Sequence, residues 1–216
     1  MPEGAAVNAT VLIPAYNEAL TVGAVVGVAV RAGYPVIVAD DGSSDATARL
    51  AEQAGARVVR LPENRGKGGA IAAGLAQVAT PYVILLDGDL VGLRPEHLQT
   101  LLEPVEEGRL DMAIGVFKSG GLMTDFGNRA TPYLSGQRAC RTEFLRGVPG
   151  LEAQRWPEPA ITDHLKATGA RWEYVNLSQL RQVMKEKKRG FWRGLGYRLG
   201  MYWHLLRYRW GSRRAS

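Results

Sequence analysis

Two aspartates with a single glycine between them lie near the middle of the chain. Asp87-Gly88-Asp89 directly follows the apolar run at residues 82–86. Carboxylates one residue apart at the end of a strand can face one hard cation, and the glycine lets the backbone turn closely. An Asp-Gly pair is also common in ordinary turns. The motif therefore has two interpretations: a site for Mg²⁺ or Mn²⁺ formed by Asp87 and Asp89, or a polar turn that ends a strand.

A second acidic cluster lies at residues 40–45, which read Asp-Asp-Gly-Ser-Ser-Asp. Ser43 or Ser44 can cap a following helix, and the last acid suits the first turn of that helix. Asp40 and Asp41 are not needed for such a cap. A carboxylate at a strand end is well suited to accept hydrogen bonds from a nucleobase or a ribose. We therefore expect Asp40 or Asp41 to contact a nucleotide.

The glycine-rich segment at residues 64–69 reads Asn-Arg-Gly-Lys-Gly-Gly. It is not a P-loop, because such a loop needs a glycine where Leu61 stands and Ser or Thr where Gly68 stands. Glycine-rich backbone with Arg65 and Lys67 at the start of a helix still favours an anion. The segment therefore predicts either a contact with a diphosphate or a turn with exposed cations.

These motifs belong to a repeated pattern of short apolar runs that alternate with stretches of helical spacing. The pattern indicates a doubly wound, Rossmann-like α/β fold, in which helices cover both faces of a parallel sheet. Ligands bind such sheets beyond the carboxyl ends of the strands, so the polar loops, including Pro-Ala-Tyr-Asn-Glu at 14–18, are expected at one edge. Carboxylates gathered there without a cation would repel one another. Strands are expected at residues 11–13, 36–38, 57–61, 82–86 and 112–116, and helices at 18–31, 44–54, 66–78 and 95–106.

In this order and spacing, the four loops resemble those of glycosyltransferase family 2, an inverting group of the GT-A fold that includes the dolichol-phosphate mannose synthases. The resemblance covers about residues 8–117 and rests on residues 11–18, 40–45, 64–70 and 87–89. It implies transfer of a sugar from a nucleoside diphosphate, UDP or GDP, with Mg²⁺ or Mn²⁺ held by Asp87 and Asp89. It also implies nucleotide-sugar contacts by Pro14, Ala15, Tyr16, Glu18, Asp40, Asp41, Lys67, Asp87 and Gly88.

The resemblance also directs attention to an acid in the second half of the chain. Members of the family often use an Asp or Glu there to deprotonate an acceptor hydroxyl, which makes Asp163 the candidate base. Asp89 would take part in catalysis through the metal, which acts as a Lewis acid. Paired acids are common at this point in the family, whereas Thr162 precedes Asp163 here. An acid at a helix N-terminus is the alternative interpretation of Asp163.

Residues 133–139 look like the acceptor-side segment of several family members. Small residues there permit close approach, and polar side chains supply donors; the acceptor-binding candidates are Ser135, Gly136, Gln137 and Arg138. A helix start with a surface arginine explains the same pattern. Residues 118–129 contain three glycines and few large apolar side chains, so a mobile loop that orders over bound donor is expected.

The C-terminal segment, residues 181–216, is strongly basic. It has eleven Lys or Arg against one Glu, a net +10, and since the whole chain is +6, residues 1–180 sum to −4. Its apolar residues recur every three or four positions, which predicts an amphipathic helix too interrupted by arginine to span a bilayer: Trp192, Leu195, Leu199, Tyr202 and Leu206. The expected partner is an anionic membrane surface, and docking on the body or a homodimer contact is the alternative.

Length and composition bear on the number of domains, the location of the protein and its partners. Residues 1–180 are expected to form one domain, with a nucleotide-sugar half at 1–117 and an acceptor half at 118–180. The N-terminus lacks a signal-peptide pattern and Cys140 is a lone cysteine, so a cytoplasmic location is expected, without a transmembrane helix. An isoelectric point of about 9.6 suggests nucleic-acid binding, but the positive charge is confined to the tail, so no nucleic-acid partner is expected.

The function that the sequence favours is transfer of a hexose, or an N-acetylated relative, to a polyprenyl phosphate at the inner face of the cytoplasmic membrane. A phosphate acceptor is already ionised and needs little base catalysis, which suits both the single acid at Asp163 and the basic tail. Transfer to a soluble hydroxyl acceptor, with Asp163 as base, is the runner-up. The sequence does not separate UDP from GDP, and inversion is implied only by the resemblance.

Overall fold

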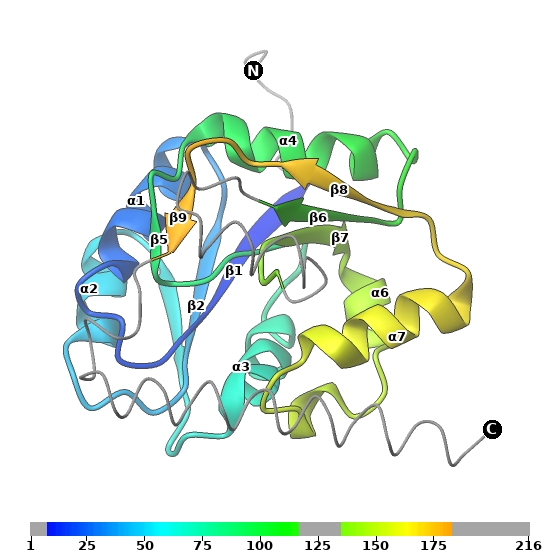
Figure 1. Ribbon diagram of the computed structural model, residues 1–216. Coiled ribbons are helices and arrows are strands. Elements are labelled where there is room, and N and C mark those ends of the chain that lie inside the picture. The colour runs from blue at the N-terminus through cyan, green and yellow to red at the C-terminus, as the bar shows by residue number, and fades with distance from the viewer. Residues whose placement is uncertain (1–7, 117–134, 183–216) are drawn as a thin grey trace, which may run out of the picture. The chain divides into compact units, whose positions relative to one another are not determined.

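The computed structural model describes residues 8–116 and 135–182 of the chain. These residues form a mixed α/β fold around a seven-stranded sheet of order β3-β2-β1-β4-β7-β6-β8, with a separate two-stranded sheet of β5 and β9 (Figure 1). The chain divides into two compact units, Met1–Arg181 and Gln182–Ser216. The second unit lies almost wholly outside the described residues, so the domain boundary at residue 180 stays a prediction.

The first half of the chain builds the parallel part of the sheet, as the alternating pattern predicts. β1 pairs in parallel with β2 and β4, and β2 pairs in parallel with β3. The expected and observed elements differ mainly at their ends: β1 and β2 extend beyond the expected apolar runs, and α1 begins at Val22 rather than at residue 18. The elements are β1 (Ala9–Ala15), α1 (Val22–Arg31), β2 (Val36–Asp40), α2 (Thr47–Gln53), β3 (Arg57–Arg60), α3 (Gly66–Leu75) and β4 (Tyr82–Leu85).

Apart from β6, the second half adds strands that carry no long apolar run. β7 runs antiparallel to both β4 and β6, and β8 pairs in parallel with β6 at the edge of the sheet. The alternative interpretation of residues 133–139 as a helix start is therefore wrong, since β7 begins at Arg138. The elements are β5 (Leu90–Val91), α4 (Pro95–Glu106), β6 (Met112–Val116), β7 (Arg138–Arg141), α6 (Thr142–Arg146), η2 (Leu151–Ala153), α7 (Glu158–Thr168), β8 (Trp172–Asn176) and β9 (Arg181–Gln182).

Helices cover both faces of the sheet, and each strand of the centre supplies side chains to both. In β1, Val11 and Ile13 pack with the helices α1, α2 and α4, whereas Leu12 packs with α3, α6 and α7. This alternation is the period of two that a strand imposes on its side chains. Burial of both sides fixes the register of the sheet and hence the position of the loop at each strand end.

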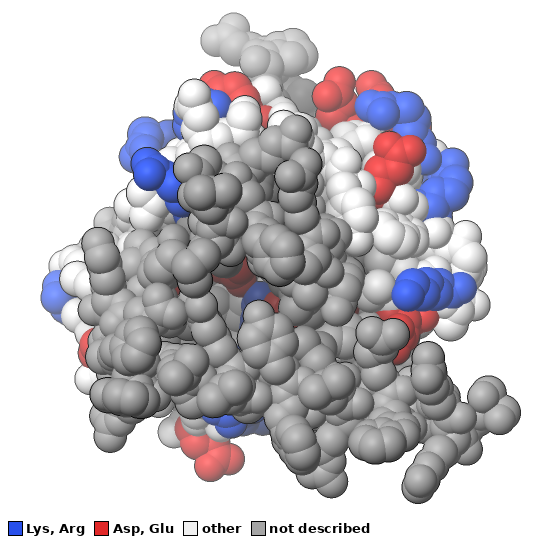
Figure 2. Space-filling model, in the orientation of Figure 1, with Lys and Arg blue, Asp and Glu red and all other residues white. Residues whose placement is uncertain are grey.

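Charge on the described surface is mixed. On the face of the molecule in Figure 2, the described Lys and Arg side chains are interspersed with Asp and Glu rather than gathered in one patch. Within the described part of the chain, no helix is both long enough and apolar enough to cross a membrane. The predictions for the loop at 118–129 and the tail at 181–216 fall on residues that lie, almost entirely, outside the described part.

Candidate active site

The topology of the sheet explains why polar loops that are distant in sequence meet. β1, β2 and β4 run in the same direction, so the loops that follow them leave from one edge. β7 runs the opposite way and pairs Arg138 with Leu85 of β4, so the residues that precede β7 lie beside the residues that follow β4. The donor-side motif at 87–89 and the acceptor-side segment at 135–138 are therefore neighbours.

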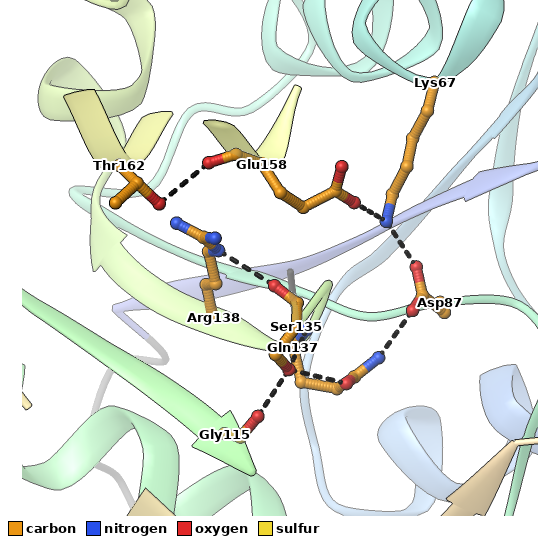
Figure 3. A network of polar contacts seen from close by, with 8 residues as sticks. All are labelled: Lys67, Asp87, Gly115, Ser135, Gln137, Arg138, Glu158 and Thr162. Atoms are coloured by element: carbon orange, nitrogen blue, oxygen red, sulfur yellow. Dashed lines mark hydrogen bonds and ion pairs between the residues drawn. The ribbon is translucent and has the colours of Figure 1, made fainter. Parts of the chain in front are cut away.

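Asp87 is held by donors from two directions at the end of β4. Lys67 Nζ lies 2.7 Å from Asp87 Oδ1, and Gln137 Nε2 donates to Asp87 Oδ2 at 2.8 Å (Figure 3). The Asp87 side chain is 16% exposed, and Gln137 is fully buried. Two of the sequence predictions, Lys67 for the donor and Gln137 for the acceptor, thus meet on one carboxylate.

Lys67 also binds a second carboxylate, which the sequence did not single out. Its Nζ lies 2.5 Å from Oε1 of Glu158, the first residue of α7. Burial by itself would lower the pKa of Lys67, but the charges of Asp87 and Glu158, and the hydrogen bonds to both, outweigh it and raise that pKa above its ordinary value. Lys67 is therefore a firmly charged ammonium between two acids.

Gly136 passes so close to this ion pair that any side chain at this position would displace it. A Cβ at position 136 would lie 2.5 Å from each carboxylate oxygen of Asp87 and 2.6 Å from Lys67 Nζ. These distances are well inside van der Waals contact, so a side chain would have to push Asp87 or Lys67 away. The glycine is required by packing against the charged pair rather than by an unusual φ angle.

A buried arginine anchors the segment that contains Gly136. Arg138 is 1% exposed, and its Nε donates to the carbonyl oxygen of Ser135 at 3.0 Å, which closes the turn before β7. Burial lowers the pKa of Arg138, while the nearby charge of Glu158 acts in the opposite direction. Ser135 in turn donates to the carbonyl oxygen of Gly115 in β6. The four acceptor-side candidates are thus a fixed part of the site wall.

The start of α3 connects the Asp87 cluster to the acidic loop after β2. Both oxygens of Asp41 accept backbone hydrogen bonds, from Arg65 at 2.7 Å and from Gly66 at 2.9 Å. The Gly68 N–H donates to the Gln154 carbonyl oxygen at 2.9 Å. Burial raises the pKa of Asp41, although these two hydrogen bonds oppose that rise. Groups of the protein itself therefore take three of the backbone donors, those of Arg65, Gly66 and Gly68, that the glycine-rich pattern would offer to a ligand anion.

The loops after β1 and β2 are tied to each other by hydrogen bonds. The Asn17 N–H donates to Ser43 Oγ at 2.9 Å, and the Ser44 N–H donates to Asn17 Oδ1 at 2.9 Å. Neither serine caps α2, which makes the capping interpretation wrong; Asp45 accepts the hydrogen bond from the Thr47 N–H instead. Asp40 is buried and accepts from the Ser43 N–H at 3.1 Å.

The remaining donor-side candidates lie on the same edge. A Cβ added at Gly88 would contact Glu18 Cγ at 3.5 Å and Ala15 Cβ at 3.6 Å, so the loop after β1 touches the loop after β4. Pro14 precedes Ala15 in β1, and Tyr16 directly after it is 37% exposed. The structure thus brings the predicted nucleotide-sugar residues to one edge of the sheet.

Comparison with known proteins identifies the family to which the chain belongs. The model for "Glycosyl transferase family 2" matches residues 10–171, which include every loop described above. The chain belongs to glycosyltransferase family 2. The resemblance found in the sequence and the expected GT-A fold are both confirmed.

Family 2 relatives match parts of the chain. Glycosyltransferase AglJ of Haloferax volcanii is 39% identical over 107 residues, which are 49% of this chain and 34% of AglJ. The undecaprenyl-phosphate 4-deoxy-4-formamido-L-arabinose transferase of Serratia proteamaculans is 39% identical over 111 residues, 46% of this chain and 34% of that protein. The chain thus spans about a third of the length of these two curated relatives.

A solved structure of another glycosyl-transferring enzyme matches more of the chain. Glucosyl-3-phosphoglycerate synthase from Mycobacterium tuberculosis, in complex with Mn²⁺, UDP-glucose and phosphoglyceric acid, superposes with a TM-score of 0.67 at 25% identity. The match covers 82% of this chain and 72% of that one. The similarity therefore extends beyond the donor-side loops into the second half of the fold.

The two carboxylates after β4, Asp87 and Asp89, are those of the metal motif that the family resemblance implies. Asp89 is 5% exposed and Asp87 is largely buried, and both supply carboxylate oxygens, the hard donors that Mg²⁺ and Mn²⁺ prefer. Within the described residues, no group of three or more His, Cys, Asp or Glu side chains is arranged to hold a metal. A cation held by one or two carboxylates together with substrate phosphates needs no third protein carboxylate. The residues present fit such a shared site.

Asp163, the predicted base, lies apart from the Asp87 cluster. It is an exposed residue of α7, whereas Glu158 and Thr162 on the same helix are buried, and the Thr162 Oγ1 donates to the Glu158 carbonyl oxygen at 2.8 Å. The acid in the first turn of this helix is Glu158, not Asp163. A role for Asp163 as base stays a prediction, and Glu158 is the carboxylate that α7 brings to the site.

Proposed function

We propose that this chain transfers a hexose, or an N-acetylated relative, from UDP or GDP to a phosphate-bearing acceptor, preferably a polyprenyl phosphate at a membrane surface. The observation that carries the proposal is the position of Asp87, which a donor-side lysine and an acceptor-side glutamine contact at once. A site in which both sides of a transfer meet at one carboxylate is suited to bringing donor and acceptor together.

The donor side of the proposal rests on the loops after β1, β2 and β4. Asp40 and Asp41 are buried at the end of β2, where the nucleoside is expected, and Lys67 supplies a fixed positive charge near the expected diphosphate. A solved relative holds UDP-glucose, which supports a nucleoside diphosphate sugar as the donor class. A transfer assay with UDP- and GDP-linked hexoses distinguishes the two nucleotides.

A divalent cation, Mg²⁺ or Mn²⁺, is proposed as cofactor. Asp87 and Asp89 would hold it, and when bound it would neutralise the charge that develops on the diphosphate leaving group. The relative that holds UDP-glucose also holds Mn²⁺, which supports a cation of this class. The protein's own contribution is to bury and orient both carboxylates before the donor arrives.

The acceptor is proposed to react through a phosphate oxygen. The name of one relative refers to undecaprenyl phosphate, which supports a phosphate as the acceptor group. Phosphoglycerate, which a solved relative holds, carries a hydroxyl as well as a phosphate and supports only a phosphate-bearing acceptor. A phosphate monoester is largely ionised at neutral pH, so its oxygen needs no base before it attacks the sugar carbon. A bond forms between that oxygen and the anomeric carbon as the bond to the diphosphate breaks, and nucleoside diphosphate leaves. Inversion at that carbon is the expected outcome of a single displacement.

The basic segment at 181–216 is proposed to hold the enzyme on an anionic membrane surface, where a polyprenyl phosphate would be presented. This part of the proposal rests on the sequence, which places a net +10 on that segment. Transfer to a soluble hydroxyl acceptor with Asp163 as base is the competing function, and it requires neither lipid nor a basic tail.

The test is a transfer assay with the purified full chain. UDP- and GDP-linked hexoses are offered with Mn²⁺, and the acceptors are a polyprenyl phosphate in detergent, the matching polyprenol, and phosphoglycerate. Sugar on the polyprenyl phosphate but not on the polyprenol supports the proposal. Sugar on phosphoglycerate alone would overturn the polyprenyl phosphate as acceptor, and sugar on the polyprenol or other hydroxyl compounds would overturn the phosphate requirement.

A further inference from the structure

Two carboxylates of different origin share the ammonium of Lys67. Asp87 follows β4 and belongs to the loop that is proposed to hold the divalent cation, whereas Glu158 begins α7 and belongs to no metal motif. Figure 3 shows Lys67 reaching down from α3 with its Nζ between the two acids. Lys67 is therefore bonded to one of the two oxygens through which Asp87 could bind a cation.

The charges around this ammonium nearly balance. Lys67 and Arg138 are positive, Asp87 and Glu158 are negative, and the Arg138 guanidinium lies close enough to both acids to feel their charge. Asp89, the other carboxylate of the proposed cation site, is buried and adds one more negative charge. A divalent cation alone would turn this excess negative charge into an excess positive one, and a nucleoside diphosphate alone would leave the cluster strongly negative. Charges interact more strongly away from bulk water, so each ligand would bind poorly without the other.

We propose that Lys67 is the resident counter-ion of Asp87, which it leaves when a divalent cation and a nucleoside diphosphate enter together, and that Glu158 is the positioning residue that keeps the released ammonium in the site. The inference rests on the proposed function, because it takes Asp87 as part of the cation site. It adds a role for Glu158 and an order to the binding of the two ligands.

The position of Glu158 suits this role. Its side chain is 10% exposed, and its first turn is fixed by the hydrogen bond from Thr162 to its carbonyl oxygen. Because it lies on α7 and not in the loop at 87–89, it keeps its hold on Lys67 when Asp87 turns to the cation. The ammonium that Asp87 releases then remains available to the diphosphate, whose negative charge replaces that of Asp87.

The mechanism makes cation and nucleotide binding depend on each other. Coupling of this kind is reciprocal and commonly amounts to roughly 5- to 150-fold in affinity. We expect Mn²⁺ to bind the full chain that much more tightly in the presence of UDP or GDP, whichever stabilises the protein more. The free Mn²⁺ signal in electron paramagnetic resonance titrations measures this affinity without any turnover.

Two substitutions break the same Lys67–Glu158 ion pair and have opposite expected effects. Lys67→Met removes the counter-ion, so Mn²⁺ without nucleotide binds at least about fivefold more tightly than to the wild type. Glu158→Gln leaves the whole ammonium on Asp87, so Mn²⁺ binds at least about fivefold more weakly, with and without nucleotide. An ion pair that serves the fold alone, without electrostatic contact with the cation, would give both variants a change in the same direction, or none.

Two matched control variants distinguish the effect of the positive charge at position 67 from the effect of losing any lysine. Lys67→Arg keeps the positive charge and is expected to bind Mn²⁺ as weakly as the wild type. Lys166→Met removes a lysine from the exposed face of α7 and is expected to leave Mn²⁺ binding unchanged. If Lys67→Met unfolds because two buried acids face each other, Mn²⁺ restores its far-UV circular dichroism under the proposal, and failure to restore it would count against the proposal.

The outcomes distinguish this inference from the proposed function. The wild type could transfer sugar while both variants bind Mn²⁺ more weakly or as well as the wild type. That result overturns the counter-ion role and leaves the transferase function standing. Opposite changes in Mn²⁺ affinity in a protein that transfers no sugar would support the counter-ion role and overturn the function.

Discussion

Gly136 leaves no space for a side chain between its backbone and Asp87. A Cβ at this position would lie 2.5 Å from each oxygen of the Asp87 carboxylate. Gly136→Ala is therefore expected to displace Asp87 from Lys67 and Gln137, to weaken nucleoside diphosphate binding at least about tenfold, and to lower the free energy of unfolding by about 1–3 kcal/mol. Isothermal titration calorimetry and urea unfolding measure the two effects.

A glycine in open surroundings provides the control for that substitution. A Cβ at Gly23 in α1 would meet nothing closer than 3.7 Å, the carbonyl oxygen of Leu50. Gly23→Ala is expected to leave nucleotide binding unchanged and to keep or slightly raise stability, since alanine favours a helix. Equal effects of the two alanines on nucleotide binding would show that contact with Asp87 is not what matters at Gly136.

The close contact between α3 and η2 gives a prediction about the fold alone. A Cβ on Gly68 would overlap the carbonyl oxygens of Leu151 and Gln154, which are backbone atoms and cannot rotate away. Gly68→Ala is expected to lower the free energy of unfolding by at least about 1–3 kcal/mol and to break the hydrogen bond from its N–H to Gln154. A urea unfolding midpoint equal to that of the wild type would contradict this packing.

Cys140 predicts a particular dependence of stability on pH. Burial raises the pKa of this thiol to about 12, whereas a cysteine in an unfolded chain has a pKa of about 8.5. The folded pKa is the higher one, so this contribution to stability is complete below about pH 8.5 and is lost as the pH rises toward 12. Between pH 7 and 10, the wild type should lose about 2 kcal/mol more unfolding free energy than Cys140→Ala. Parallel losses in urea unfolding would show that the thiol does not contribute.

Asp163 distinguishes the two acceptor chemistries. A phosphate acceptor needs no base, and Asp163 is exposed on α7, so Asp163→Asn should change the rate of transfer to a phosphate by less than about twofold. A hydroxyl acceptor that uses Asp163 as base would lose about 100-fold or more. Initial rates with the polyprenyl phosphate at saturating donor measure the difference, and a large loss there would restore Asp163 to the reaction.

The donor side of the site was predictable from the sequence because its information is local. Each strand of the parallel sheet is an apolar run, and the polar residues that follow it must lie at the edge where parallel strands end. The loops at 14–18, 40–45 and 87–89 therefore came together as expected. The bounds of α4 and β6 were also predicted as observed, since Pro95 and a fully apolar pattern define them.

The acceptor side was not predictable in the same way. β7 contains arginine at both ends, so it has no apolar run, and only its place between β4 and β6 makes it a strand. Glu158 stands before a proline and has no local signal of function. It reaches Lys67 because α7 packs over the sheet beside α3, and that is a tertiary contact 91 residues away in sequence.

Binding of the donor nucleotide is the most direct test of the central claim, which is that this site holds a nucleoside diphosphate through a divalent cation on Asp87 and Asp89. The thermal midpoint is measured with UDP and GDP, with and without Mn²⁺, for the wild type, for Asp89→Asn, and for Asp111→Asn as a matched loss of charge on a surface ion pair. At a ligand concentration about 100 times its Kd, one nucleotide should raise the wild-type midpoint by roughly 5–10 °C when Mn²⁺ is present. Asp111→Asn should keep that rise and Asp89→Asn should lose it, whereas a protein that no nucleotide stabilises, with or without Mn²⁺, would contradict the account.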